Sequence, residues 1–349
     1  MTSDPSKNAY IVDLLGQPNA LKETLAAFER PGFRGFEPIA AKLRSGKLRR
    51  AVLTGMGSSY HALHPLFLGM VRRGLPAQMI ETSELIHHAA GLISADTLTV
   101  IVSQSGRSAE VLRLLERIPP GAPVVGVTNT ADSPLAGQAG AVLLTRAGAE
   151  STVSCKTYLA TMAALALLEN LLAGEDPRPM LADLQSLPDA VGRYFARMED
   201  YLAEMKGMLE GVRAVFLAGR GPSQAAAGTG GLIIKEAAHF PAEGMSSASF
   251  RHGPLELVSP EIFVLVYAGP PATAVLSKEL AADIRKAKGR SALVKESAEE
   301  EAFHLPPAPA AGLPILEILP AQILSVALAE LHGHTPGVFS VASKVTGTE

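Results

Sequence analysis

Residues 98–108 read LTVIVSQSGRS, an apolar run followed by three serines, a glutamine and a glycine. The run predicts a buried strand that ends at Ser103, and helical spacing resumes at Ser108. Backbone N–H groups, the dipole of the following helix and three hydroxyl groups can converge on one anion there. The side chains that would contact such an anion are Ser103, Gln104, Ser105 and Ser108.

A second serine-containing loop, GMGSS at 55–59, follows the strand expected before it. In a parallel sheet both loops would lie at the carboxyl edge of the strands, where ligands bind. The pair of loops therefore indicates a phosphorylated small molecule. Capping of helix N-termini is the alternative role for these serines.

Short apolar runs alternate with segments of helical spacing along the whole chain, which predicts an α/β fold with helices on both faces of a parallel sheet. The first half should hold strands at Ala51–Thr54, Ala77–Ile80, Leu98–Ser103, Val124–Thr128 and Ala141–Leu144, with helices near Tyr60–Arg73, Ser108–Arg117 and Lys156–Leu172. The second half should hold strands at Ala214–Ala218, Ile262–Tyr267, Ser291–Lys295 and Pro314–Leu319, with helices near Ser223–Ala238, Ala274–Lys288 and Pro320–Leu331.

The two halves echo each other, since AVLTGMGSSY at 51–60 and AVFLAGRGPS at 214–223 both predict a strand, a glycine turn and a helix start. We therefore expect two similar doubly wound parallel-sheet lobes. A charged amphipathic helix over Val191–Leu209 would link them. The expected domains are entry helices at 1–45, a first lobe at 46–175, a linker helix at 176–210, a second lobe at 211–335 and a C-terminal tail at 336–349.

Composition excludes several classes of protein. The 349 residues suit two domains, and 31 basic against 34 acidic residues, with no basic run, argue against nucleic acid as a partner. The single cysteine, Cys155, excludes an intrachain disulfide and a thiolate zinc cluster. Because no signal peptide opens the chain and apolar stretches such as Tyr158–Leu168 are too short to span a bilayer, we expect a cytoplasmic protein that binds no membrane.

Neither a cofactor nor a metal is expected. The dinucleotide pattern G-x-G-x-x-G fails at its third glycine, because Tyr60 and Gln224 stand there in the two halves. The adjacent histidines at 87–88 point to different sides of a helix, and the histidines of HGH at 332–334 lack an evident carboxylate partner.

A weaker signal for acid–base chemistry lies in the second half, where Lys235 and Glu236 end an apolar helix and His252 follows. A carboxylate partly buried against Leu232 and Ile233 would have a raised pKa, which suits a proton shuttle. A solvated helix face and a structural histidine are the alternative interpretations.

Taken together, the motifs resemble those of the sugar isomerase (SIS) domain family, in particular the isomerase half of glucosamine-6-phosphate synthase and related aminosugar-phosphate deaminases. The resemblance covers nearly the whole chain. Its motifs are GQPNAL (16–21), GSSY (57–60), SQSG (103–106), ESTVSCK (150–156), KE (235–236), FRHGPL (250–255) and ASK (342–344).

The resemblance implies a reaction on an open-chain hexose 6-phosphate. Lys344 would form a Schiff base with the ketose carbonyl, Glu236 would move a proton between the first two sugar carbons, and His252 would assist ring opening. The phosphate would be held by Ser59, Ser103, Gln104, Ser105 and Ser108, and the rest of the substrate by Ser58, Ser154, Lys156 and Ser343. The family also implies a homodimer with a shared active site.

The chain departs from the synthase pattern at several points. We expect no glutaminase activity, because no such domain and no cysteine precedes Cys155. Ile233 stands where the synthase has a second lysine, and the segment 150–156 is one residue shorter. We therefore expect an isomerase and deaminase that converts glucosamine 6-phosphate to fructose 6-phosphate and ammonia. The alternatives are a fructosamine-6-phosphate deglycase and a non-catalytic phosphosugar sensor.

Overall fold

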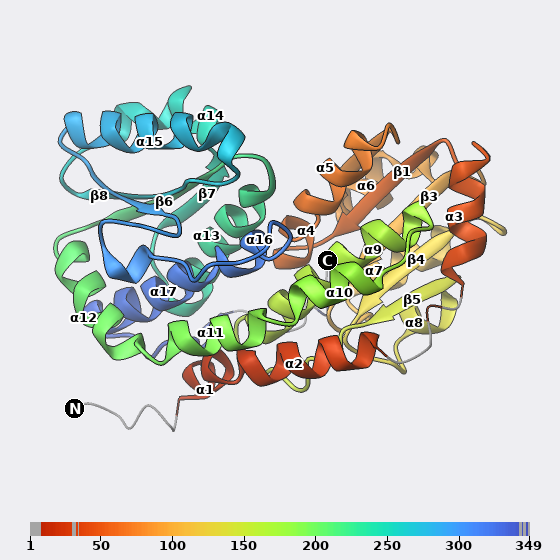
Figure 1. Cartoon of the computed structure of the whole chain (residues 1–349), viewed down its shortest axis with the longest axis horizontal. Helices are drawn as coiled ribbons and strands as arrows, with labels where there is room; N and C mark the ends of the chain where they lie inside the picture. The colour runs from red at the N-terminus through yellow and green to blue at the C-terminus, as the bar shows by residue number, and fades with distance from the viewer. Residues whose placement is uncertain (1–7, 30–32, 34, 342–343, 345–346, 348–349) are drawn as a thin grey trace. The chain divides into compact units, whose positions relative to one another are not determined.

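The computed structural model describes residues 8–29, 33, 35–341, 344 and 347 (Figure 1). These residues divide into two compact units. The five-stranded unit comprises residues 19–149, 156–185 and 342–349, and the four-stranded unit comprises residues 1–18, 150–155 and 186–341. The domain boundaries expected from the sequence stay predictions.

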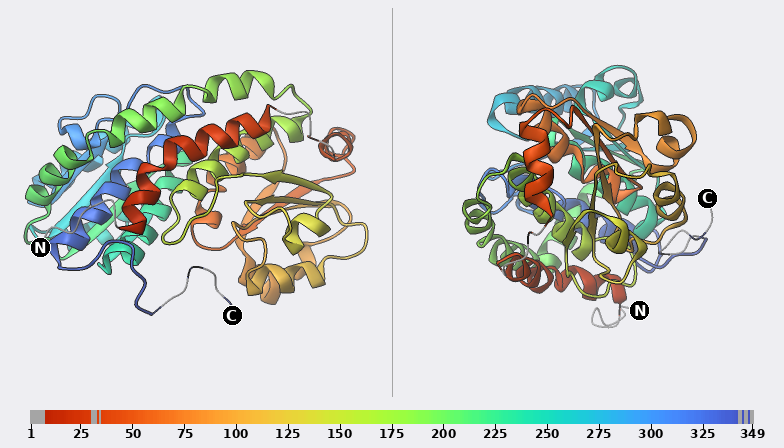
Figure 2. Two further views of the ribbon diagram at one scale, coloured as in Figure 1. Left: turned by 90° about the horizontal axis from the view of Figure 1, so that it is seen from below. Right: turned by 90° about the vertical axis from the view of Figure 1, so that its right-hand side faces the viewer.

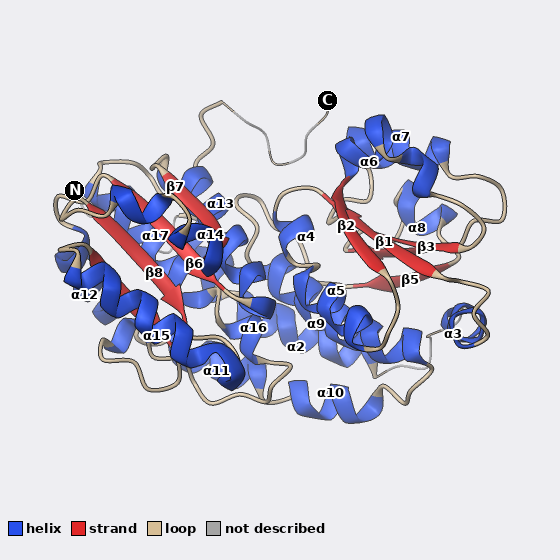
Figure 3. Cartoon of the chain, turned by 90° about the horizontal axis from the view of Figure 1, so that it is seen from above, coloured by secondary structure: helices blue, strands red, loops and turns tan. Residues whose placement is uncertain are grey.

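The five-stranded unit is built on a parallel sheet with the strand order β2-β1-β3-β4-β5. Its strands are β1 (Arg50–Gly55), β2 (Ala77–Glu81), β3 (Thr97–Val102), β4 (Val124–Thr128) and β5 (Ala141–Leu144). All residues of β3 and β4 are buried, as expected of strands covered on both faces. One face carries α6 (Thr82–His88), α7 (Ala109–Arg117) and α8 (Pro134–Gln138), and the other carries α5 (His64–Arg72) and α9 (Lys156–Ala173) (Figure 3).

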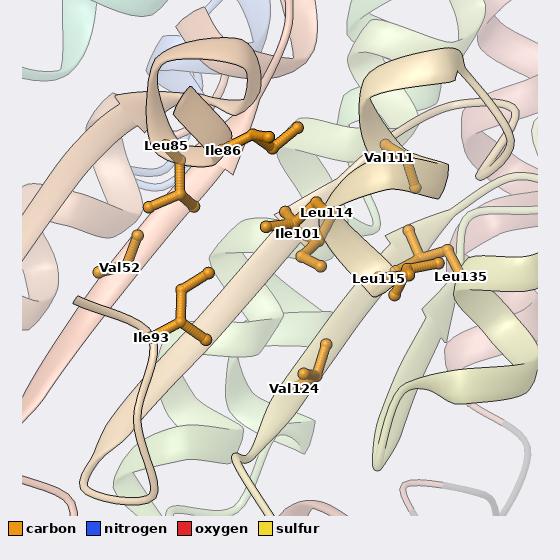
Figure 4. Packing of buried hydrophobic residues seen from close by; sticks show 10 residues of the cluster. All are labelled: Val52, Leu85, Ile86, Ile93, Ile101, Val111, Leu114, Leu115, Val124 and Leu135. Carbon is orange, nitrogen blue, oxygen red and sulfur yellow. The ribbon is translucent and has the colours of Figure 1, made fainter. Parts of the chain in front are cut away.

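The core on the α6–α8 face explains why α7 forms where it does. Val111, Leu114 and Leu115 recur at helical spacing, so they all face the sheet and are buried there. Their partners are apolar residues of the sheet, of α6, of the loop before β3 and of α8: Val52, Leu85, Ile86, Ile93, Ile101, Val124 and Leu135 (Figure 4). This packing fixes the start of α7 against the end of β3.

The four-stranded unit repeats the plan with the order β7-β6-β8-β9. Its parallel strands are β6 (Ala214–Gly219), β7 (Ala242–Ser246), β8 (Ile262–Tyr267) and β9 (Arg290–Val294). Figure 1 shows α13 (Gln224–Ala238) and α17 (Leu319–Leu331) on one face and α14 (Ser247–Arg251) and α15 (Pro271–Lys286) on the other. The prediction of two similar doubly wound parallel-sheet lobes is therefore confirmed.

The contact between α13 and β7 depends on glycine. A Cβ added at Gly244 would lie 2.0 Å from the carbonyl oxygen of Ala227, and one added at Gly231 would lie 2.5 Å from the nitrogen of Gly244. The helix can therefore lie directly against the strand only because both positions lack a side chain.

Two sequence predictions about the elements are wrong. The strand expected at Pro314–Leu319 is helical, comprising α16 (Leu313–Leu316) and the start of α17. Short buried apolar runs do not distinguish a strand from a core helix by periodicity. The strand β7 was not predicted, because AEGMS contains no β-branched or aromatic residue.

The remaining elements are mostly helical. They are α1 (Ala9–Leu15), α2 (Gln17–Phe28), α3 (Phe36–Arg44), α4 (Ser58–His61), α10 (Arg178–Leu184), α11 (Leu187–Phe195), α12 (Met198–Leu209) and the 3-10 turns Ala90–Leu92, Gly221–Ser223, Pro254–Leu257 and Glu301–Phe303. The linker helix expected over Val191–Leu209 is thus divided between α11 and α12, and the helix expected over Tyr60–Arg73 between α4 and α5.

Residues 313–331 are long and apolar enough to cross a membrane by length and composition alone. However, 89% of the most apolar window is buried inside the structure, as in the core helix of a folded domain. The absence of a membrane partner stays a prediction.

Candidate functional site

The two serine-containing loops follow β1 and β3, which lie side by side in the five-stranded sheet. Thr54 pairs with Ile101 near the carboxyl ends of these parallel strands, so both loops leave the same edge of the sheet. In the order β2-β1-β3-β4-β5 this is the switch point, where the chain connections run to opposite sides and open a crevice for a ligand. The structure thus brings the predicted phosphate-binding serines of both loops to the same edge of the sheet.

Two serines of the loop after β3 form hydrogen bonds within the loop. The backbone N–H of Gly106 donates to the Ser103 hydroxyl over 3.1 Å, and the N–H of Arg107 donates to the Ser105 hydroxyl over 3.3 Å. Each oxygen acts as an acceptor within the loop, which leaves its own O–H to donate elsewhere. Two hydroxyl donors therefore remain available for an anion.

The geometry does not favour N-capping as the role of the other serines. Ser108 occupies the N-cap position of α7, yet its side chain makes no capping hydrogen bond. Ser58 and Ser59 lie inside α4, whose N-cap is Gly57. All three hydroxyls thus lie at helix starts without serving the caps, and the N-terminus of α7 adds a favourable dipole for a negative charge.

A third loop, after β4, supports the loop after β3 and was not identified from the sequence. The N–H of Asn129 and the hydroxyl of Thr128 both donate to the carbonyl of Gln104, over 3.0 and 3.2 Å. The Asn129 side chain also donates to the carbonyl of Gly148 over 2.8 Å and accepts from the N–H of Ala147 over 2.7 Å. The polar run TNT directly after a buried strand was the available signal.

The second set of predicted catalytic residues belongs to the four-stranded unit. Glu236 is half-buried near the C-terminal end of α13, and the adjacent Lys235 is exposed and lies 3.2 Å from Glu243. His252 is exposed at the C-terminal end of α14, where Gly253 adopts a φ of 138°. The expected partial burial of the Glu236 carboxylate is therefore present.

Glu236 is one of several polar groups that act on the buried Tyr10. Burial raises the pKa of Tyr10 well above its usual value, and the nearby acidic groups Cys155, Glu236 and Glu150 raise it further, whereas a hydrogen bond to Ser325 lowers it. Electrostatic influence of this kind requires proximity. The N–H of Cys155 donates to the Glu150 carboxylate over 2.9 Å, which orients that acid. Tyr10 has no predicted role at this site, and Glu150 is predicted only as part of the motif 150–156.

The remaining predicted residues are divided between the units. Ser154 is half-buried in the four-stranded unit. Lys156 is the first residue of α9 in the five-stranded unit, and its ammonium group donates a hydrogen bond to the carbonyl of Ala149 over 2.6 Å. Lys344 is half-buried and belongs to the five-stranded unit, and Ser343 lies outside the described residues. The two sets belong to different units, and their meeting at one site stays a prediction.

No cluster of three or more histidine, cysteine, aspartate or glutamate side chains suited to a metal occurs among the described residues. The predicted site residues provide hydroxyl donors and a helix N-terminus in one unit and a half-buried glutamate in the other. These groups can bind an anion and move a proton.

Comparison with known proteins extends this description. The family model described as SIS domain matches residues 45–170. A glutamine–fructose-6-phosphate aminotransferase (isomerizing) of Pyrococcus horikoshii is 30% identical over 338 residues, which are 93% of this chain and 55% of that protein. The chain spans about half the length of the curated relatives it matches.

Solved structures share the fold of the whole chain. The C-terminal domain of glucosamine-fructose-6-phosphate aminotransferase from Francisella tularensis superposes with a TM-score of 0.84 at 19% identity, covering 96% of this chain and 98% of that one. Glucosamine-6-phosphate deaminase from Thermotoga maritima gives 0.78 at 18% identity, covering 97% of this chain and 100% of that one. At such identities the likeness shows the fold alone.

Proposed function

The chain is a SIS-domain protein, and on that premise we propose that it binds a sugar phosphate and acts as an aldose–ketose isomerase and deaminase. Its substrate would be glucosamine 6-phosphate, converted with water to fructose 6-phosphate and ammonia. The observation that carries the proposal is the meeting of two serine loops at the β1/β3 switch point, where the α7 N-terminus adds its dipole.

Phosphate binding follows from the chemistry of these loops. Ser103 and Ser105 have oxygens that already accept backbone N–H groups, so their protons are free to donate to phosphate oxygens. Ser59 and Ser108 add two further hydroxyls at helix starts. Hydrogen bonds to a charged acceptor are the strong ones, and several of them would hold the substrate while its other end reacts.

The reaction needs an open sugar chain and one mobile proton. His252 would transfer a proton at the ring oxygen to open the sugar. The Glu236 carboxylate would take the proton from the second carbon of the aldose and return it to the first, while one proton of the amine passes to the oxygen of the first carbon, which gives an imine at the second carbon. The Lys344 amine would attack this imine and release ammonia, and water would then hydrolyse the lysine adduct to fructose 6-phosphate.

Ile233 supports deamination over synthesis. The side chain is fully buried one turn before Glu236, where the resemblance to the synthase places a second lysine. An apolar side chain there offers no amine for handling an incoming nitrogen. The names of the Pyrococcus relative and the Thermotoga structure are consistent with a substrate among amino-sugar phosphates.

A substrate panel tests the proposal. The purified protein would be incubated with the 6-phosphates of glucosamine, mannosamine and galactosamine and with fructosamine 6-phosphates carrying larger amines, and ammonia and fructose 6-phosphate would be measured together. We expect equal amounts of both products from glucosamine 6-phosphate and neither from Glu236→Gln. Release of the larger amine instead would identify a deglycase, and binding without turnover of any compound would identify a sensor.

A further inference from the structure

The chain after α17 is fastened to the end of α13, the helix that carries Glu236. The N–H of Gly337 donates to the carbonyl of Ala237 over 3.0 Å, and the Nε2 atom of His239 lies 3.0 Å from the carbonyl of Val338. These contacts join residues about a hundred positions apart in the sequence. The chain segment that leads toward Lys344 therefore departs from a point next to Glu236.

The N-terminal helix α1 holds the same segment from the other side. The side chain of Asn8 donates to the carbonyl of Pro336 over 3.0 Å and at the same time caps α1 by accepting from the N–H of Ile11. Figure 2 shows α1 beside α17, and there the hydroxyls of Tyr10 and Ser325 lie 3.1 Å apart in the interior. The segment is thus hydrogen-bonded both to the N-cap residue of α1 and to α13.

Gly337 can occupy this position only because it has no side chain. Its φ is 74°, and an added Cβ would lie 2.4 Å from the Cβ of Tyr10 and 2.7 Å from its ring. Gly333, four positions earlier, has a nearly identical φ of 73° but nothing within 4 Å of an added Cβ. An alanine at either position would bear the same backbone strain, but only at 337 would it also clash with Tyr10.

We propose that Pro336, Gly337 and Val338, which we call the tail anchor, are positioning residues for Lys344, held by Asn8, Tyr10 and His239. The inference rests on the proposed function, in which Lys344 forms the Schiff base. Five residues lie between Val338 and Lys344, so the extended chain that joins them spans at most about 20 Å. A fixed start of the tail limits how far the lysine amine can move from Val338, which raises its effective concentration within that reach.

The anchor also explains why α1 matters to the chemistry. Tyr10 lies against Gly337, and the charge of Glu236 raises the pKa of its hydroxyl, so a single buried side chain interacts with both the departing tail and the carboxylate. A shift of α1 would alter the tail and the surroundings of Glu236 together.

The test compares Gly337→Ala with its matched control Gly333→Ala in the full chain. Fructose 6-phosphate is added with borohydride, which reduces the lysine imine, and the rate of covalent labelling at Lys344 is measured by peptide mass spectrometry. Binding of glucitol 6-phosphate, which has no carbonyl, is measured by calorimetry. We expect Gly337→Ala to lower labelling and kcat by tenfold or more while glucitol 6-phosphate binds within twofold of wild type, and Gly333→Ala to label at close to the wild-type rate.

A second variant tests the same hypothesis in case Gly337→Ala fails to fold. His239 adopts a φ of 51°, a conformation that asparagine also tolerates, so His239→Asn keeps the helix end but is too short to reach Val338. Like Gly337→Ala, it should lower the rate of covalent labelling at Lys344, and it should speed amide hydrogen exchange in residues 335–341. Equal labelling of wild type, Gly337→Ala and His239→Asn would overturn the anchor, as would an equal loss in Gly333→Ala. Absence of labelling and of ammonia release in the wild type would instead contradict the proposed function.

Discussion

The Ser223 hydroxyl donates to a carboxylate oxygen of Glu317 over 2.8 Å, with both side chains buried in the four-stranded unit. The second oxygen of Glu317 has no hydrogen-bond partner among the described residues. Burial raises the pKa of this carboxyl group to about 8, and the Ser223 hydrogen bond offsets only part of that rise. The four-stranded unit therefore holds a carboxylic acid that is protonated at neutral pH.

The raised pKa of Glu317 makes stability depend on pH. Between about pH 5 and 8 the group is ionised in the unfolded chain but protonated in the folded one, so the folded state binds more protons and stability falls as pH rises. Over this window the free energy of unfolding should fall by roughly 4 kcal/mol through this group. Glu317→Gln, which keeps an acceptor for Ser223, should remove that slope in urea unfolding between pH 5 and 8. Parallel profiles for the two proteins would contradict the assignment.

The serines of the loop after β3 should control affinity for the substrate. Ser103→Ala combined with Ser105→Ala removes two hydroxyl donors, and bonds to a charged group contribute about 1.5–3 kcal/mol each. We expect the KM for glucosamine 6-phosphate to rise tenfold or more. Ser45→Ala, at an exposed position after α3, serves as the control and should leave KM unchanged. An unaltered KM in the double variant would remove these serines from the binding site.

Gly106 should be as sensitive as the serines. Its φ is 61°, and an added Cβ would lie 2.4 Å from the Ser133 hydroxyl, so Gly106→Ala must displace the loop. Gly121 has a φ of 83° with nothing within 4 Å, and Gly121→Ala therefore bears only the backbone strain, about 1–2 kcal/mol. The KM of Gly106→Ala should exceed that of Gly121→Ala by tenfold or more in steady-state assays. Similar constants for both would show that loop shape does not govern binding.

We also expect a homodimer in which His252 completes the site of a second copy. His252 is exposed at the end of α14, as required of a group that acts on another molecule. Co-expressed hybrids of His252→Ala and Glu236→Gln subunits should regain part of the activity that each parent lacks, because one of the two sites then has both residues intact. The hybrid is isolated with two affinity tags, and inactivity of that purified heterodimer would place the site within one chain.

The site could be predicted from the sequence only where its parts are local. The segment SQSGRS predicts a strand end and a helix start within six residues. The position of its hydroxyl groups at a helix N-terminus could therefore be predicted without the tertiary structure. The hydrogen bond from Asn129 to that loop could not be predicted, because it depends on β4 lying beside β3. Tyr10 gave no signal, since an apolar face with one tyrosine is the ordinary pattern of a core helix.

Local sequence patterns are enough to predict the fold class and the position of the loop after β3, because strand burial, helix spacing and turn residues are set by neighbours within a few positions. The tertiary structure is needed to show that residues 314–319 are helical and that AEGMS forms a strand, because burial among other elements overrides weak local preference. It also decided that Gly337 lies against Tyr10, a contact between residues over three hundred positions apart that no local pattern encodes.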